Sequence, residues 1–412
     1  MSHSLADSDV LVVGAGPAGT HLAIRLARAG FQVTLLDQKR FPRRKPCGEF
    51  MSPECLPLLD ELGMRAELGA LGARRVRGMD LHGYGTTARG TYGPVGSTPA
   101  PFDHGLAIRR EVLDDLALRT ARATPGVIVL EGARVVDLLR SGDGTLLGAI
   151  ARDEHGENRE LRARFTVGAD GLRSVVAKKL GVRRETAWLR RFALVLRWRG
   201  EFLEDHSSVH LFPGGYFAVS AVDQGFKTVN LVVAAAALPP GKRALPAFVA
   251  EHLERAPLLK ESLQGATREE EILAIGPLAG TTTQQAFSGG ALLGDACGYV
   301  DPLTGEGLFF AMRGAQILAR ALTQALHSGH TDRASLVGYE RERRDHFGLR
   351  MSLSRMLQRG LRYPNLARMV MHAFAAHPGL CDLAVAFAGD YVPARELLRP
   401  SVWMHALAGR TA

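Results

Sequence analysis

Residues 10–19 read VLVVGAGPAG, a short apolar run that passes directly into a glycine-rich turn. The unbroken aliphatic run predicts a buried parallel strand. Gly14 permits the sharp bend, Gly16 lets a pyrophosphate approach the backbone, and Gly19 lets the next helix pack on the strand. Free N–H groups at the start of that helix favour a dianionic pyrophosphate. This stretch therefore predicts a dinucleotide-binding domain.

An acidic residue follows at the position that such a domain requires. Asp37 ends a second predicted strand, residues 31–36, and stands eighteen residues past Gly19. There a carboxylate accepts hydrogen bonds from the ribose hydroxyls of adenosine. A glycine-rich turn alone is weak evidence, but here strand, turn, helix, strand and acid follow in order. We therefore also place Pro17, Ala18 and Gln38 at the cofactor.

Two later motifs each follow a short apolar run. Residues 165–174 read FTVGADGLRS, and residues 291–298 read ALLGDACG. The stretch DPLTGEG at 301–307 then leads into a helical pattern over residues 308–326. The start of that helix can stabilise negative charge on a ligand. An ordinary loop before a helix would explain one such motif, but three in sequence indicate a single cofactor site.

In this order the motifs resemble those of single-FAD flavoproteins with the p-hydroxybenzoate-hydroxylase (PHBH) architecture. The resemblance implies that the bound dinucleotide is FAD. It implies an Asp-Gly pair near the pyrophosphate, a second Asp on the ribitol hydroxyls, and glycines against the isoalloxazine. The residues so implied are Asp170, Gly171, Gly294, Asp295, Pro302, Gly305, Glu306 and Gly307.

Residues 108–114, IRREVLD, resemble the R-x-x-L-D helix start of the same families. In those families the Arg lies near the cofactor, and alignment on the Leu-Asp pair selects Arg110. The alternative is that Arg109 or Arg110 only caps a solvated helix face.

Within the superfamily, the chain most resembles the geranylgeranyl-reductase branch. GDACG followed by DPLTGEG resembles that branch's GDAAG and PLTGEG, whereas aromatic hydroxylases read GDAAH. KPCGE at residues 45–49 resembles its K/Y-x-C-G-G segment, which implies Lys45, Cys47 and Gly48 beside the flavin. FPGGY at residues 212–216 resembles its PGGYGW segment. However, Glu49 replaces the second glycine, and the Trp position is held by Ala218 or Phe217, so a prenyl substrate does not carry over.

Several reactions use this architecture, because FAD alone does not name one. The motifs favour NADPH- or NADH-linked reduction of a carbon–carbon double bond, with Cys47 and Tyr216 as candidate catalytic residues. For Cys47 the alternative is a small residue packed in a tight loop. Hydroxylation or epoxidation through a flavin hydroperoxide is the second reading, and a non-catalytic flavoprotein is a further one. The family's Arg three residues after Ser174 is missing, since Ala177 and Lys178 stand there, which weakens nicotinamide docking.

Halogenation ranks last. Halogenases of this superfamily carry a WxWxIP segment and a Lys that captures hypohalous acid. Trp188, Trp198 and Trp403 do not form that segment, and Lys227 stands alone on a predicted strand, as a solvated Lys would.

Composition bounds the remaining possibilities. The 412 residues are 46% hydrophobic and 23% charged, which is an ordinary globular balance. The net charge of +9 comes mainly from Arg, but the basic residues form no aromatic-interleaved stripe, so nucleic-acid binding is not expected. The four cysteines show no CxxC spacing, which indicates neither a metal site nor a disulfide framework. The start lacks a signal-peptide pattern, and the longest apolar run, residues 231–238, is too short to span a bilayer. We expect a cytoplasmic protein.

The motif positions predict an α/β fold with a discontinuous Rossmann-like FAD domain, an antiparallel substrate sheet and a C-terminal helical region. We assign residues 1–80, 105–182 and 274–330 to the FAD domain, residues 81–104 and 183–273 to the substrate sheet, and residues 331–412 to the helices. Predicted strands over residues 192–199, 207–212, 216–222 and 228–235 would form the sheet.

The sheet face that covers the flavin sets the kind of substrate. Strand alternation would turn Phe192, Leu194, Leu196, Tyr216 and Ala218 toward the flavin, which predicts a small lipophilic substrate. The alternative is that this face only packs on helices.

Seven arginines between Arg341 and Arg362, with Phe347, Met351, Met356 and Leu357 among them, predict a helix with an apolar stripe and a basic flank. Such a helix either belongs to the core or rests on an anionic membrane.

Overall fold

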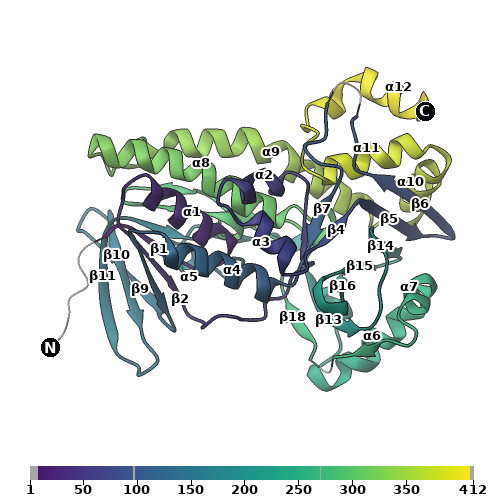
Figure 1. The fold of residues 1–412 in the computed structure, drawn as a ribbon, viewed down its shortest axis with the longest axis horizontal. Helices are drawn as coiled ribbons and strands as arrows, with labels where there is room; N and C mark the ends of the chain where they lie inside the picture. The colour runs from purple at the N-terminus through teal and green to yellow at the C-terminus, as the bar shows by residue number, and fades with distance from the viewer. Residues whose placement is uncertain (1–7, 96–97, 270, 409–412) are drawn as a thin grey trace.

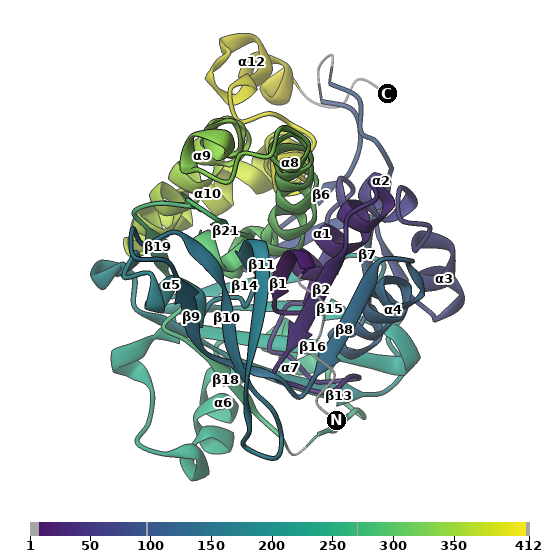
Figure 2. The ribbon, with the colours of Figure 1, turned by 90° about the vertical axis from the view of Figure 1, so that its left-hand side faces the viewer.

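The computed structural model describes residues 8–95, 98–269 and 271–408, so parts of the expected domain ranges, residues 1–7, 96–97, 270 and 409–412, lie outside it. It confirms the predicted α/β class. One eight-stranded sheet has the order β20-β21-β11-β1-β2-β8, with β10 and β9 continuing from β11 (Figure 2). Its strands are β1 (Ser8–Val13), β2 (Val33–Asp37), β8 (Val127–Glu131), β9 (Arg134–Arg140), β10 (Leu146–Arg152), β11 (Asn158–Gly168), β20 (Ala286–Phe287) and β21 (Gly290–Leu292).

The centre of this sheet is parallel and buried on both faces. β1 pairs in parallel with β11 on one side and β2 on the other. Val10 and Val12 face a core built with three helices, α1 (Pro17–Arg28), α4 (Arg110–Ala123) and α8 (Gly307–Ser328). Leu11 and Val13 face a core built with β9, β10 and the helix α5 (Val175–Lys179). The three motif-bearing segments follow β1, β11 and β21, so they meet at one edge of the sheet.

A second eight-stranded sheet has the order β17-β13-β16-β15-β14-β5-β6, with β18 paired to β13. Its strands are β5 (Gly78–Gly83), β6 (Thr86–Thr91), β13 (Arg191–Arg199), β14 (Ser207–Phe212), β15 (Gly215–Ala221), β16 (Phe226–Ala234), β17 (Thr267–Arg268) and β18 (Leu273–Ile275). It is antiparallel except where β5 pairs in parallel with β14. That exception arises because β5 belongs to a distant chain segment and is not joined to β14 by a hairpin.

Two small three-stranded sheets and the helices complete the fold (Figure 1). The small sheets contain β3 (Phe50–Met51), β4 (Arg74–Val76), β7 (Gly105–Ala107), β12 (Arg183–Glu185), β19 (Gly280–Thr282) and β22 (Gly298–Tyr299). The α-helices are α1 (Pro17–Arg28), α2 (Cys55–Asp60), α3 (Arg65–Ala70), α4 (Arg110–Ala123), α5 (Val175–Lys179), α6 (Leu245–Leu253), α7 (Pro257–Ser262), α8 (Gly307–Ser328), α9 (Val337–Gly360), α10 (Pro364–Ala376), α11 (Pro378–Ala388) and α12 (Pro400–Ala408).

The expected orientation of β13 is wrong. Leu194 and Leu196 turn away from the first sheet and pack with α6 and α7 in a separate core. Phe192 shares their phase along the strand, so the opposite phase, with Ala193 and Val195, faces the first sheet. The larger side chains fill the space under the helices, because a closed core requires bulk. Tyr216 does lie on the inner side, in contact with the cluster that contains Ala193.

The C-terminal helices hold part of the predicted basic helix inside the protein. α8 and α9 lie side by side along the first sheet (Figures 1 and 2). Phe347 and Met351 are buried, and the Arg350 side chain is 4% exposed. Among the described residues, no single helix is long and apolar enough to cross a bilayer. α10 and α11 together meet those two criteria but are bent by 110° at their junction.

Candidate functional site: the pocket between the two sheets

A cavity of about 490 Å³ lies between the edge of the first sheet and the inner face of the second. One wall comes from the motif segments, and the other comes from β13, β16, β18 and the residues that follow them. The expected residues that line the cavity are Gly16, Pro17, Ala18, Gln38, Lys45, Cys47, Gly48, Arg110, Asp170, Gly171, Asp295, Pro302, Gly305 and Gly307. Residues of all the motif segments, which lie far apart in the sequence, thus meet at one cavity.

In the glycine-rich turn, one glycine position has space for a side chain and two do not. A Cβ on Gly16 would meet only Arg43 Nη2, at 3.8 Å, so this residue faces the cavity. A Cβ on Gly19 would lie 1.8 Å from the Gly14 carbonyl oxygen, and one on Gly14 would lie 2.5 Å from the Ala169 oxygen. Gly14 and Gly19 therefore serve the close packing of strand and helix, while Gly16 leaves the N-terminus of α1 accessible to an anion.

Asp37 lies behind this turn. Its Oδ2 accepts a hydrogen bond from Ala15 N at 3.0 Å, and its Oδ1 accepts one from Lys39 N at 2.9 Å. The carboxylate thus fixes the glycine turn, and the neighbouring Gln38 and Lys39 line the cavity. A ribose contact by Asp37 stays a prediction.

Three charged side chains lie along the motif wall: Arg110 is buried, and Lys45 and Asp295 are half-buried. Burial lowers the pKa of Lys45, and the nearby Arg110 lowers it further. Burial raises the pKa of Asp295, against the opposing effects of Lys45 and Arg110. Arg110 is held by its own helix, since its Nε and Nη2 donate to the two Asp114 carboxylate oxygens at 2.8 and 2.7 Å. Arg110, rather than Arg109, is therefore the arginine at the cavity.

Asp170 caps the short helix that follows its motif. Its Oδ2 accepts hydrogen bonds from Val175 N at 2.6 Å and Val176 N at 3.2 Å. Its Oδ1 is buried and has no partner among the described residues, although the side chain lines the cavity. Gly171 follows with φ +77, a conformation that favours glycine. A ligand hydroxyl can satisfy the free carboxylate oxygen.

The opposite wall is apolar and built from small side chains. Its residues are Ala193, Val195, Ala274, Ile275 and Leu278, with Asn230 as the polar residue of the sheet; Leu172 and Arg173 of the Asp170 segment border it. Asn230 Nδ2 donates to the Ala218 carbonyl oxygen at 3.1 Å. A Cβ on Gly48 would lie 4.0 Å from the same nitrogen, so the loop of Cys47 and Gly48 faces Asn230 across the cavity.

Glu49, which replaces a glycine of the reductase motif, keeps a glycine-like backbone with φ +60. Its buried carboxylate accepts hydrogen bonds from Thr228 Oγ1, from Arg110 N at 3.0 Å and from Arg197 Nη2 at 2.5 Å. Arg197 also binds Glu111, at 2.7 and 2.8 Å. Backbone strain at this position is therefore offset by a charge pair that joins β13 to the cofactor loop.

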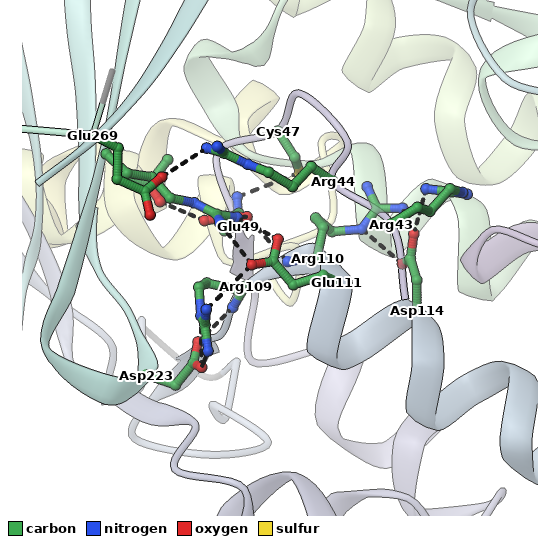
Figure 3. Close-up of polar contacts among 12 residues, drawn as sticks. Arg43, Arg44, Cys47, Glu49, Arg109, Arg110, Glu111, Asp114, Asp223 and Glu269 are labelled. Atoms are coloured by element: carbon green, nitrogen blue, oxygen red, sulfur yellow. Dashed lines mark hydrogen bonds and ion pairs between the residues drawn. The ribbon is translucent and has the colours of Figure 1, made fainter. Parts of the chain in front are cut away.

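Two more ion pairs join the same parts of the chain. Arg109 binds Asp223, and Arg44 binds Glu269 at 3.2 Å (Figure 3). Each pair joins a segment of the motif wall to the second sheet or its connections. The two walls are thus held together by charge at one side of the cavity.

The two candidate catalytic residues occupy different positions. Cys47 is half-buried at the cavity wall, where its Sγ accepts a hydrogen bond from Glu49 N at 3.3 Å. Tyr216 is fully buried behind the wall, and its hydroxyl donates to Asp301 Oδ1. Gln358 Nε2 donates to the same oxygen at 2.8 Å. Burial raises the pKa of Asp301 to about 6. Cys47 can touch a ligand, whereas Tyr216 does not line the cavity and contacts Asp301 behind its wall.

The other expected residues outside the wall have structural partners. Gly294 packs against Ala18, and Glu306 accepts a hydrogen bond from Arg350 Nη1 at 3.2 Å. Lys227 is not solvated as expected: its side chain is 3% exposed, and Nζ binds Glu204 on the far side of the second sheet. Its distance from the cavity removes it as a halogenase-type lysine.

Comparison with known proteins identifies the cofactor. Residues 7–351 match the family described as "FAD binding domain". The chain belongs to this FAD-binding family. FAD fits the residues present, because Gly16 opens a helix N-terminus, Asp170 has a free buried oxygen, and Lys45 and Arg110 supply positive charge. The chain is therefore an FAD-dependent oxidoreductase.

Members of the family with different activities are similar to this chain. A menaquinone reductase of Mycolicibacterium smegmatis is 28% identical over 93% of this chain and 92% of its own length. A digeranylgeranylglycerophospholipid reductase of Methanothrix thermoacetophila is 28% identical over 82% of this chain and 84% of its own. The structure of the myxobacterial chondrochloren halogenase CndH has a TM-score of 0.77 and 26% identity, over 84% and 81% of the two chains.

The sequence predicted an apolar face over the flavin but from the wrong residues of β13, and it gave no indication of the Glu49–Arg197 pair. Alternation along β13 showed that two faces exist but not which one faces inward. Arg197 is the residue that could have identified the inward face of β13. It lies on the same face as Ala193 and Val195, where it pairs with the buried acid Glu49. Ala274, Ile275 and Leu278 follow no motif and reach the wall only through tertiary packing.

Proposed function

We propose that this protein uses FAD to carry out NAD(P)H-linked reduction of a carbon–carbon double bond in a lipophilic small molecule. A prenyl chain, a polyketide or an alkylated aromatic fits this class. The observation that carries the proposal is the apolar wall of Ala193, Val195, Ile275 and Leu278 opposite the cofactor motifs. Apolar walls with few polar groups bind ligands by removing apolar surface from water.

The relatives support a lipid substrate. Menaquinone and digeranylgeranylglycerophospholipid, after which two of them are named, are both prenylated lipids. The small Ala218 stands on the inner phase of β15, and Phe217 points into the core under α6 and α7. We therefore infer that Ala218, rather than Phe217, stands at the position of the reductase tryptophan.

Bound FAD supplies hydride-transfer chemistry, and the side chains supply the rest. Asn230 is the polar group that can orient a substrate oxygen on the apolar wall. Cys47 lines the cavity in the loop that approaches Asn230, so we assign it the proton that a reduced double bond must gain. Tyr216 holds Asp301 in place and is a positioning residue.

The test is an anaerobic incubation of the FAD-loaded protein with NADPH and a prenylated naphthoquinone, followed by mass spectrometry. Reduction predicts a product heavier by two hydrogens on the prenyl chain. NADPH oxidation without that product, together with gain of one oxygen in air, would replace the proposal by the monooxygenase reading. Gain of a halogen in the presence of halide would replace it by the halogenase reading.

Variants separate chemistry from binding. Cys47→Ala should lower kcat by about tenfold or more with FAD content unchanged. General acid catalysis contributes roughly 100-fold or more to a rate, so the loss of the acid should be visible in kcat. Cys47→Ser should recover part of the rate. Equal rates for wild type and Cys47→Ala would leave Cys47 as a packing residue only.

A further inference from the structure

The end of α9 and the start of α10 form an exposed apolar surface, here called the α9–α10 surface. Met356, Tyr363 and Met369 are 64, 66 and 63% exposed, and Leu357 and Leu366 are about two-fifths exposed. A Cβ on Gly360 would lie 3.5 Å from Leu366 Cδ2, so the two helices touch at this point. Met356 and Leu357 stand one helical turn before Gly360, and Met369 stands one turn after Leu366, so these residues cluster around that contact, and clustered exposed apolar residues indicate an interaction site.

The same surface carries positive charge without neutralising acids. No Asp or Glu lies between Asp345 and Asp382 in the sequence. Arg359, Arg362 and Arg368 are exposed, and Arg355 is half-buried. None of the four forms an ion pair with any residue that the structure describes. Burial lowers the pKa of Arg355, with no carboxylate to oppose it.

This arrangement differs from the rest of α9. Phe347 and Arg350, one to three turns earlier, face the protein interior, where Arg350 binds Glu306 and the carbonyl oxygens of Asp390 and Val392. Arg350 therefore holds the fold together and cannot reach a partner. On the α9–α10 surface the arginines without an ion pair run from Arg355 into α10, which packs on β5 and β6 (Figure 1).

The surface also lies next to the cofactor loop. Gln358 donates to Asp301, the residue before Pro302 of the cavity wall. The following residue, Arg359, lies over the Trp188 ring at 4.8 Å. A partner bound on the α9–α10 surface would rest one helix from the flavin site.

We propose that the α9–α10 surface docks on an anionic lipid bilayer, with Met356, Tyr363 and Met369 in the interface and the arginines at the headgroups. Protruding apolar side chains among arginines match the two layers of such an interface. A second copy of this chain fits worse, because a two-fold contact would bring the same unpaired arginines together. The proposal does not depend on which reaction the flavin carries out.

The experiment is co-sedimentation of the FAD-loaded protein with vesicles of phosphatidylcholine alone or with phosphatidylglycerol, at low and high salt. We expect binding to the phosphatidylglycerol vesicles that weakens as salt rises. The variant Arg359→Gln, Arg362→Gln, Arg368→Gln should bind on the order of 100-fold more weakly, since each basic residue near an anionic surface contributes about fivefold. The matched control, Arg134→Gln, Arg159→Gln, Arg243→Gln, removes the same charge from exposed sites elsewhere and should bind within about threefold of wild type.

A second variant tests the apolar part. Met356→Ser with Met369→Ser should weaken binding at both salt concentrations, while FAD content and turnover of a short-chain soluble substrate stay unchanged. Equal losses in the arginine variant and its control would overturn the proposal, because net charge alone would then explain binding. Light scattering that shows a dimer in wild type and a monomer in the Met variant would overturn it in favour of self-association.

Discussion

The FAD pocket has two walls: the motif wall, formed by the cofactor motifs, and the sheet wall, formed by β13, β16, β18 and the residues that follow them. The two walls place opposite requirements on the sequence. The motif wall presents Lys45, Arg110 and Asp295, and its glycines let the backbone meet the ligand directly. The sheet wall presents Ala193, Val195 and other apolar groups. The first must match fixed phosphate and ribitol chemistry, whereas the second must leave a space of a certain size.

This difference explains why the motif wall is easier to predict from the sequence than the sheet wall. Chemical recognition needs particular residues at particular spacings, and those are readable. A wall that leaves free space for a ligand requires only small, apolar side chains. The strands of any protein core have such side chains as well. The ion pair between Glu49 and Arg197 joins the two walls, so breaking it is the most severe test of the comparison.

Arg197→Met should destabilise the protein by about 4 kcal/mol in the free energy of unfolding, since it leaves the buried Glu49 carboxylate without its cation. The Arg197 side chain is 3% exposed. Arg199→Met, two residues along the strand at an exposed position, should cost less than about 1 kcal/mol. Urea unfolding of both variants measures the difference. Similar small losses would mean that the walls do not depend on the pair.

The pH dependence of stability tests Asp301, which joins the segment before Pro302 to Tyr216 of the second sheet. Burial raises its pKa from 3.8 to about 6. The folded state thus holds this proton more tightly than the unfolded chain does, so the contribution is greatest below pH 3.8 and is lost as the pH rises through about 6. The loss amounts to about 3 kcal/mol.

Asp301→Asn should remove that change. The unfolding free energies of wild type and variant, measured from pH 4 to pH 7.5 on the FAD-free protein, should therefore diverge, with the variant gaining on wild type as pH rises. Parallel curves would show that Asp301 is not desolvated as the structure indicates.

Two neighbouring residues of β13 test the direction of the sheet wall. Leu194→Ala should cost about 3 kcal/mol of stability, because it opens a cavity in the core with α6 and α7. Val195→Ala should cost about 1 kcal/mol or less, because its side chain already borders a cavity, but it should change KM for a lipophilic substrate. Thermal unfolding and steady-state kinetics on both variants decide the matter. If Val195→Ala cost more stability than Leu194→Ala, and Leu194→Ala changed KM, the orientation of β13 first predicted from the sequence would be correct.

The sequence predicted the motif wall closely because each of its parts has a local signature. The strand before Gly14, the helix at Arg110 and the turn at Asp295 all lie where their patterns indicated. Which face of β13 lies toward the cavity was not predictable. Phe192, Leu194 and Leu196 are the more apolar set, but Leu194 and Leu196 pack in the core with α6 and α7. The interior position of Arg350 was likewise hidden, since its partners Asp390 and Val392 lie in a segment with no motif.

The most direct test of the two-wall account is FAD titration into apoprotein of Gly16→Val and Val195→Ala by calorimetry. Gly16→Val adds a side chain that meets no protein atom closely, so the fold should persist while FAD affinity falls at least about tenfold, or 1.4 kcal/mol. Val195→Ala should bind FAD within about threefold of wild type. Unchanged FAD affinity in Gly16→Val, with an unaltered melting temperature, would contradict the assignment of the motif wall to the cofactor.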